Sequence, residues 1–146
     1  MDDTNIDSIK LSKVLDKKQN EVLLSLNSKK ILELNLKIIN ELMLPKEVAL
    51  DYMSKLKDYR YVDNIQHLKI GTYIRWINIL DPDNLKLQRG GIICDIKKSK
   101  NEDIIITCKG ISRAHFNIKL DECLLFQKRN KDEDLIISVM DFIGDN

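Results

Sequence analysis

The sequence is poor in the residues and motifs from which reactive centres are most often built. Its 146 residues include only two histidines and three cysteines, and no Cys-x-x-Cys pair occurs. Neither histidine belongs to a His-x-x-x-His or His-x-Glu pattern, as a local metal or protease motif would require. The glycine-rich phosphate-binding patterns Gly-x-x-x-x-Gly-Lys-Ser/Thr and Gly-x-Gly-x-x-Gly are missing too. We therefore expect a protein that is not an enzyme, with no metal, no cofactor and no small-molecule substrate.

The cysteines and the N-terminus also bear on the cellular setting. An odd number of cysteines without disulfide spacing predicts buried free thiols in a reducing, intracellular compartment. Cys94 and Cys108 lie in apolar stretches, where a free thiol behaves as a small hydrophobic group. A nucleophile–base pair of Cys108 with His115 remains open. The first ten residues are polar and acidic, so we expect no secretory signal. No apolar run approaches the roughly 20 residues of a membrane span, so we expect no membrane partner.

The first 67 residues are predicted to form a helical region. Residues 1–16 are predicted to be a loose tail or a short helix near Ile9–Leu15. From Ser28, a residue suited to an N-cap, apolar side chains recur at the helical period as far as Met43. Pro45 ends this helix and suits the start of a second one. We expect a helical hairpin whose apolar surplus either covers the rest of the fold or binds another chain, a second copy included.

From Gly71 the hydrophobic pattern changes to a period of two, which predicts β-strands. Five short strands are expected, over residues 73–79, 87–97, 104–108, 116–120 and 124–128. Short strands separated by turns at this spacing predict a small antiparallel barrel, closed or half-closed, over residues 68–131. Residues 132–146 open with three acids and continue with apolar residues, which predicts an acidic C-terminal helix packing on the barrel. The predicted fold class is α+β.

The only adjacent glycines, Gly90 and Gly91, raise the question of a phosphate-binding loop. No lysine or hydroxyl follows them at the spacing of such loops, and the residues after them predict a strand rather than a helix N-terminus. Glycines that lead into a strand are typical of a bulge or a tight bend. Gly90 and Gly91 are therefore predicted to be structural glycines at a corner of the barrel.

Two resemblances extend these predictions. The segments Leu68–Trp76, Gly91–Ile93 and Ile118–Asp121, in that order, resemble Tudor-like or Src-homology-3-like small barrels, in which the second strand bends sharply to join both halves of the sheet. The strings TYIRWINILDPDNLKLQRGGIICDI and DECLLFQK, with the acidic C-terminal segment, resemble an uncharacterised protein family of large nucleocytoplasmic DNA (giant) viruses. That resemblance implies a viral context, in the host cytoplasm, nucleus, viral factory or virion, and assigns no site.

The charge is unevenly distributed, although the whole chain carries only +1. Residues 69–131 hold thirteen Lys and Arg against seven Asp and Glu, and residues 132–146 hold five acids and no base. A basic β-barrel suits nucleic acid, because its cations neutralise phosphates and exposed aromatic rings stack on bases. The candidate nucleic-acid-binding residues are Tyr73, Arg75, Arg89, Lys97, Lys98, Lys100, Arg113, Lys128 and Arg129. Trp76 shares a strand face with Ile74 and is expected in the core, which leaves Tyr73 as the better stacking residue.

The same charges have a second interpretation, in which the lysines form an ordinary solvated surface. The acidic C-terminal helix would then dock on the barrel and offset its field. Two functional hypotheses follow from the sequence. The first is a non-catalytic module that contacts nucleic acid within a larger, viral assembly. The second is a structural or adaptor protein, such as a minor virion component, that uses its helices and barrel edge to bind other proteins.

Overall fold

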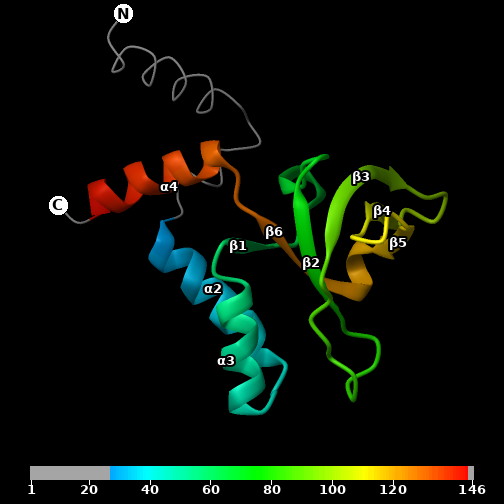
Figure 1. Cartoon of the computed structure of the whole chain (residues 1–146), viewed down its shortest axis with the longest axis horizontal. Coiled ribbons are helices and arrows are strands. Elements are labelled where there is room, and N and C mark those ends of the chain that lie inside the picture. The colour runs from blue at the N-terminus through cyan, green and yellow to red at the C-terminus, as the bar shows by residue number, and fades with distance from the viewer. Residues whose placement is uncertain (1–26, 145–146) are drawn as a thin grey trace, which may run out of the picture. The chain divides into compact units, whose positions relative to one another are not determined.

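The computed structural model describes residues 27–144, so the tail or short helix predicted near Ile9–Leu15 lies outside the described residues. The fold is α+β, as predicted, with three α-helices and one antiparallel sheet of six strands in the described part of the chain (Figure 1). The helices are α2 (Ser28–Glu41), α3 (Lys46–Lys55) and α4 (Lys131–Gly144). The strands are β1 (Tyr59–Val62), β2 (Tyr73–Asn78), β3 (Gly91–Lys98), β4 (Ile104–Lys109), β5 (His115–Lys119) and β6 (Cys123–Lys128), with 3₁₀ turns η3 (Ile65–His67) and η4 (Leu120–Glu122).

The sheet differs from the prediction in its number of strands. Its order is β1-β6-β2-β3-β4-β5, and it is open, because the two end strands β1 and β5 do not pair with each other within the described chain. The prediction of five strands is wrong, since β1 lies in the region that was predicted to be helical. This strand has only four residues, and one of its two buried residues is Arg60. Its strand conformation is defined by pairing with β6, some sixty residues later.

The described chain divides into two compact units. One unit is Leu34–Lys128, and the other joins the described residues before Leu34 to those from Arg129 onwards. No helix within residues 27–144 is both long enough and apolar enough to cross a membrane.

The sheet of the first unit has an apolar cluster on each face. One cluster includes Ile74, Trp76, Ile93 and Leu125, so the prediction that Trp76 lies in the core is confirmed. Its ring packs against Phe116, with the ring centroids 5.2 Å apart. The cluster on the other face is formed by residues from both sheet and helices, namely Ile39, Leu56, Ile77, Leu87 and Phe126. The end of α2 and the end of α3 therefore cover this second face.

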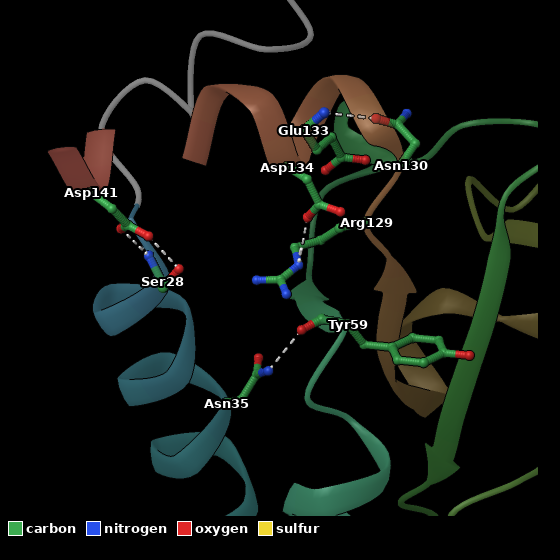
Figure 2. Close-up of polar contacts among 8 residues, drawn as sticks. All are labelled: Ser28, Asn35, Tyr59, Arg129, Asn130, Glu133, Asp134 and Asp141. Atoms are coloured by element: carbon green, nitrogen blue, oxygen red, sulfur yellow. Dashed lines mark hydrogen bonds and ion pairs between the residues drawn. The ribbon is translucent and has the colours of Figure 1, made fainter. Parts of the chain in front are cut away.

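The outer edge of β1 is protected by a side chain. Asn35, on α2, is almost fully buried and donates from Nδ2 to the Tyr59 carbonyl oxygen over 3.0 Å (Figure 2). Its Oδ1 accepts from the Tyr61 backbone N–H, also over 3.0 Å. The side-chain amide thus bonds the strand as a neighbouring strand would, which removes two backbone groups from the exposed edge.

Backbone geometry explains why glycine occupies the junction of β2 and β3. Gly90 has φ +95°, and a Cβ placed there would lie 2.0 Å from the Ile74 carbonyl oxygen. A Cβ at Gly91 would lie 2.7 Å from the Lys109 carbonyl oxygen. Neither position tolerates a side chain without a backbone shift, so this corner of the sheet is held by close contact between main chains.

A bulge a few residues later corrects the prediction that Cys94 is buried. The register of β3 against β4 shifts between Ile93 and Asp95. As a result Ile93 and Ile96, three residues apart, both lie at the core cluster, while Cys94 between them is exposed. The extra residue in a bulge breaks the alternation of faces on which the prediction rested. Cys108 and Cys123 are buried free thiols.

In the second unit, two asparagines cap the helices. Asn27 Oδ1 accepts from the Lys30 N–H at the start of α2, so Asn27, not Ser28, is the N-cap. Ser28 instead donates from its N–H and its hydroxyl to the Asp141 carboxylate, over 2.8 and 2.6 Å (Figure 2). These bonds lower the pKa of Asp141. At the start of α4, Asn130 Oδ1 accepts from the Glu133 N–H over 2.8 Å.

Candidate nucleic-acid interface

Basic and aromatic side chains form a row across three neighbouring strands of the sheet. The pairing of β1 with β6 places Tyr59 opposite Lys128. The pairing of β2 with β6 places Ile74 opposite Gln127, and Tyr73 and Lys128 are the residues next to this pair on the two strands. One position along the strands, Arg75 lies opposite Phe126. Since side chains alternate between the faces of a strand, Tyr59, Tyr73, Arg75 and Lys128 share one face, and Ile74 and Gln127 lie on the other.

The row lies on the face that the helices cover, beyond the part that they bury. Ile77 and Leu87 are buried in the cluster with the helical residues. Tyr59, Tyr73 and Arg75 are only partly buried, and Lys128 is exposed. The helices therefore leave this end of the face accessible. We call Tyr59, Tyr73, Arg75, Arg89 and Lys128 the basic end of the sheet.

Arg75 is fixed in position by a backbone contact. Its Nε donates to the Gln88 carbonyl oxygen over 2.9 Å. Arg89 follows directly, is exposed, and borders a shallow hollow of about 350 Å³ with Gly90, Ile111 and Ser112. Arg113 belongs to the same turn, because its N–H donates to the Gly110 carbonyl oxygen over 3.1 Å. The glycine junction thus brings the β4–β5 turn, with its arginine, next to Arg89.

The electrostatics of the basic end favour an anion. Among residues 27–144, no carboxylate lies within the 4.0 Å of an ion pair from Arg75, Arg89 or Lys128. Burial raises the pKa of Tyr59, and the nearby Arg75 guanidinium acts in the opposite direction by favouring the phenolate. The positive charge of Arg75 on β2 therefore acts on the Tyr59 ring of β1.

The remaining predicted residues do not join this group. Lys97 and Lys98 end β3, where they pair with Asp95 over 3.4 Å and with Glu102 over 3.9 Å. Lys100 is exposed in the turn that follows. Arg129 belongs to the other compact unit, where its Nε lies 3.3 Å from an Asp134 carboxylate oxygen (Figure 2). Of the nine residues predicted from the sequence, the structure places Tyr73, Arg75 and Lys128 on one face of adjoining strands. Arg89 follows the Gln88 carbonyl that Arg75 bonds, and Arg113 lies in the adjoining turn.

The sequence-based candidates missed Tyr59, because its segment was predicted to be helical. The signal in the sequence is faint. Tyr59-Arg60-Tyr61-Val62 alternates between aromatic residues and others, and its burial alternates in step. Four residues are too few for a period of two to stand out.

The nucleophile–base pair that the sequence left open is not formed. Cys108 pairs with Phe116 across β4 and β5, and His115 pairs with Lys109. Neighbouring residues of a strand point to opposite faces, so His115 is exposed on the face away from Cys108. Burial also raises the pKa of Cys108 to about 12, which keeps the thiol protonated and unreactive.

The part of the chain that the structure describes holds no group of three or more His, Cys, Asp and Glu side chains that could bind a metal ion. No protein-family model, curated protein or solved structure matches the chain.

Proposed function

We propose that the chain is a non-catalytic binding module whose basic end of the sheet contacts the phosphates of a nucleic acid, within a larger assembly of viral origin. One observation carries the proposal. Arg75 and Lys128 lie on the adjoining strands β2 and β6 beside two half-buried tyrosines, and Arg75 bonds the carbonyl oxygen of Gln88, next to which Arg89 is exposed. None of the three bases has an acid from the described residues in ion-pair contact. Cations beside partly exposed aromatic rings are the side chains that grip single-stranded nucleic acid.

Each residue has a definite role in this proposal. Lys128 and Arg89 are exposed and neutralise phosphates, which releases counterions. Arg75 is a positioning residue, since its bond to the Gln88 carbonyl oxygen fixes the backbone that carries Arg89. Tyr73 offers a ring face for stacking. Its neighbour across the strands, Ile92, is exposed and widens the apolar surface.

The test measures the affinity for fluorescently labelled single-stranded oligonucleotides as a function of salt. A phosphate grip gives a linear fall of log K with log salt. The double variant Arg89→Gln with Lys128→Gln should reduce the steepness of that line by about 1.4, which is about 0.7 for each phosphate of a single strand that is no longer neutralised. Both side chains are exposed, so the fold should be retained, as circular dichroism would verify.

A matched control uses two bases from the end of β3. Lys97→Gln with Lys98→Gln removes the same charge from a place where both lysines already pair with acids. This variant should leave the slope within about half a unit of the wild type. An equal reduction in both double variants would mean that net charge alone drives binding, and absence of binding at low salt would overturn the proposal.

We also infer that β2 to β6 curve into a half-closed small barrel of the Tudor-like or Src-homology-3-like type. Three features support this. The five strands follow the order β6-β2-β3-β4-β5, β3 carries a bulge between Ile93 and Asp95, and Gly90 turns the chain sharply before β3. A bulge and a glycine corner are the devices by which a sheet bends. The pairing of α2 and α3 as a hairpin is inferred from the cluster that residues of both helices share.

A second candidate function, a structural or adaptor protein, is favoured by apolar residues that the helices leave exposed. Leu36, Met43 and Leu50 are 43%, 89% and 60% exposed. Ile39, on the same helix as Leu36, is fully buried. A substitution at Leu36 therefore tests an interface, whereas a substitution at Ile39 tests the core. Leu36→Asp should keep the fold and, if this surface binds another chain, abolish that association in analytical ultracentrifugation or a pull-down.

Ile39→Asp is the matched variant and should destabilise the unit by more than about 4 kcal/mol, because it buries an unpaired charge. The adaptor function would be excluded if the wild-type protein were monomeric and its pull-down contained no partner that the Leu36→Asp variant loses.

A further inference from the structure

The end of the sheet opposite the basic end holds a cleft that the proposed function does not use. The cleft has a volume of about 330 Å³ and lies entirely within the compact unit Leu34–Lys128. It is bounded by the end of β1, the start of β6, η4 and the turn between β3 and β4. Its most buried lining residues, Val62 and Cys123, form an apolar floor together with the half-buried Ile104, Leu120 and Leu124.

All charged residues that line the cleft are acids. Asp63, Glu102 and Asp121 are exposed and Asp103 is partly buried, so carboxylates surround the apolar floor. They come from three segments: the end of β1, the β3–β4 turn and η4. Asp63 and Asp121 form no ion pair with a base of the described residues. Glu102 and Asp103 lie 3.9 and 3.8 Å from the ammonium groups of Lys98 and Lys119.

Tyr61 forms one wall of the cleft, and the pKa of its phenol responds to the electrostatic potential there. The ring packs on Phe126, with centroids 5.7 Å apart. Burial raises the pKa of the Tyr61 phenol, and the charges of Asp63 and Glu41 raise this pKa further. A cation in the cleft would act in the opposite direction.

We propose that this cleft binds a lysine or arginine side chain presented by a segment of a partner protein. Such a side chain has two parts, an apolar stem and a charged tip, and the cleft has the two matching parts, an apolar floor and an acidic rim. The volume is at the small end of ligand pockets, which suits one side chain and its flanking backbone. The occupant is complementary in charge to the cleft, whereas a phosphate would be repelled.

This inference goes beyond the nucleic-acid module, because it places a second binding surface at the opposite end of the same strands. The two surfaces differ in sign, so each excludes the ligand of the other. A module of this kind would join a phosphate backbone at one end to a basic protein segment at the other.

To test this proposal, the ¹⁵N-labelled full chain is titrated with the peptide Gly-Ser-Lys-Lys-Ser-Gly, acetylated and amidated at its ends. NMR follows the backbone amide resonances and the tyrosine-ring resonances. Binding should shift the resonances of Asp63, Leu120 and Leu124 and should lower the pKa of Tyr61. The double variant Asp63→Asn with Asp121→Asn should raise the Kd for the peptide by about fivefold or more, since it removes two partly screened charge contacts.

Two controls make the test specific. Asp83→Asn removes an exposed acid of the β2–β3 loop, outside the cleft, and should change the Kd by less than about twofold. A peptide with both lysines replaced by glutamine should not bind. The proposal is overturned if the shifts fall outside the cleft, if Asp83→Asn weakens binding equally, or if spermidine binds more tightly than the peptide.

The two proposals fail independently. Asp63→Asn with Asp121→Asn should retain oligonucleotide binding, and Arg89→Gln with Lys128→Gln should retain peptide binding. A protein that binds the peptide but no oligonucleotide would leave the cleft proposal standing and remove only the function of the basic end.

Discussion

The two ends of the sheet in the Leu34–Lys128 unit are built by different means. At the basic end the main chains touch: Gly90 lies against Ile74, and buried Gln127 bonds two backbone groups of the segment before β2. At the acidic end exposed ion pairs, at 3.8 to 3.9 Å, surround an open cleft. Close backbone packing is costly to disturb, whereas exposed ion pairs add little. We therefore expect substitutions in the close backbone packing of the basic end to cost more stability than substitutions in the ion pairs of the acidic end.

The largest effect is expected from Gly90→Ala. The new Cβ would overlap the Ile74 carbonyl oxygen at 2.0 Å, in a conformation with φ +95° that L-residues avoid. We expect a decrease of more than about 3 kcal/mol in the free energy of unfolding, measured by urea denaturation. Gly71→Ala is the matched control, because Gly71 has φ +87° but nothing lies within 4 Å of its Cβ. It should lower the free energy of unfolding by only about 1 to 2 kcal/mol, and equal decreases would show that strain alone, not the close approach, matters.

Gln127→Ala should have the next largest effect. The side chain is fully buried, donates from Nε2 to the His67 carbonyl oxygen and accepts the Lys69 N–H, both over 2.9 Å. Truncation leaves two buried backbone groups unsatisfied, which should cost about 2 to 4 kcal/mol. Asn117→Ala, which removes an exposed side-chain bond to Thr107 on β4, should cost under about 1 kcal/mol. If Asn117→Ala were the more damaging, the expectation that the buried bonds of Gln127 contribute more than an exposed side-chain bond would be wrong.

Lys119→Gln tests the acidic end and should scarcely change stability. Its ammonium lies 3.8 Å from carboxylate oxygens of both Asp103 and Glu122, and the side chain is 47% exposed. We expect a change within about 0.5 kcal/mol in thermal unfolding. A destabilisation above about 1.5 kcal/mol would mean that this end is held by its ion pairs after all.

The smallest effects concern two tyrosines, one at each end. Burial raises the pKa of both, but the largest charge effect on Tyr59 comes from the cation Arg75, whereas the charges that act on Tyr61 are those of acids. Arg75→Gln should therefore raise the pKa of Tyr59, and Asp63→Asn should lower the pKa of Tyr61, as NMR titration of the rings would show. If both pKa values shifted in the same direction, the contrast between a positive and a negative end of the sheet would be wrong.

The same shifts give a pH dependence with a defined sign. Each folded-state pKa is raised above the unfolded value of about 10. The folded protein therefore holds these protons more tightly. The resulting stability is complete below about pH 10 and is lost as the pH rises through the folded pKa. Tyr61→Phe should reduce the alkaline loss of stability in unfolding measured at several pH values.

Local pattern was sufficient for part of this fold. The helical period before Pro45 matches α2, and the period of two after Gly71 matches β2 and the strands beyond it. Placing Trp76 in the core needed only the face that it shares with Ile74. Where a local rule was broken the prediction failed: the bulge beside Ile93 left Cys94 exposed, and Asn27 took the capping role assigned to Ser28.

The sequence by itself determined the fold class, the order of helices and strands after Gly71, and the surplus of positive charge, because these depend on residues a few positions apart. Only the tertiary structure decided which charges meet. Arg75 and Lys128 are brought together on the adjoining strands β2 and β6 by strand pairing, while Lys97 and Lys98 are carried by β3 to pair with acids. Strand register and the bend at Gly90 join residues some fifty positions apart, and no local periodicity encodes such pairings.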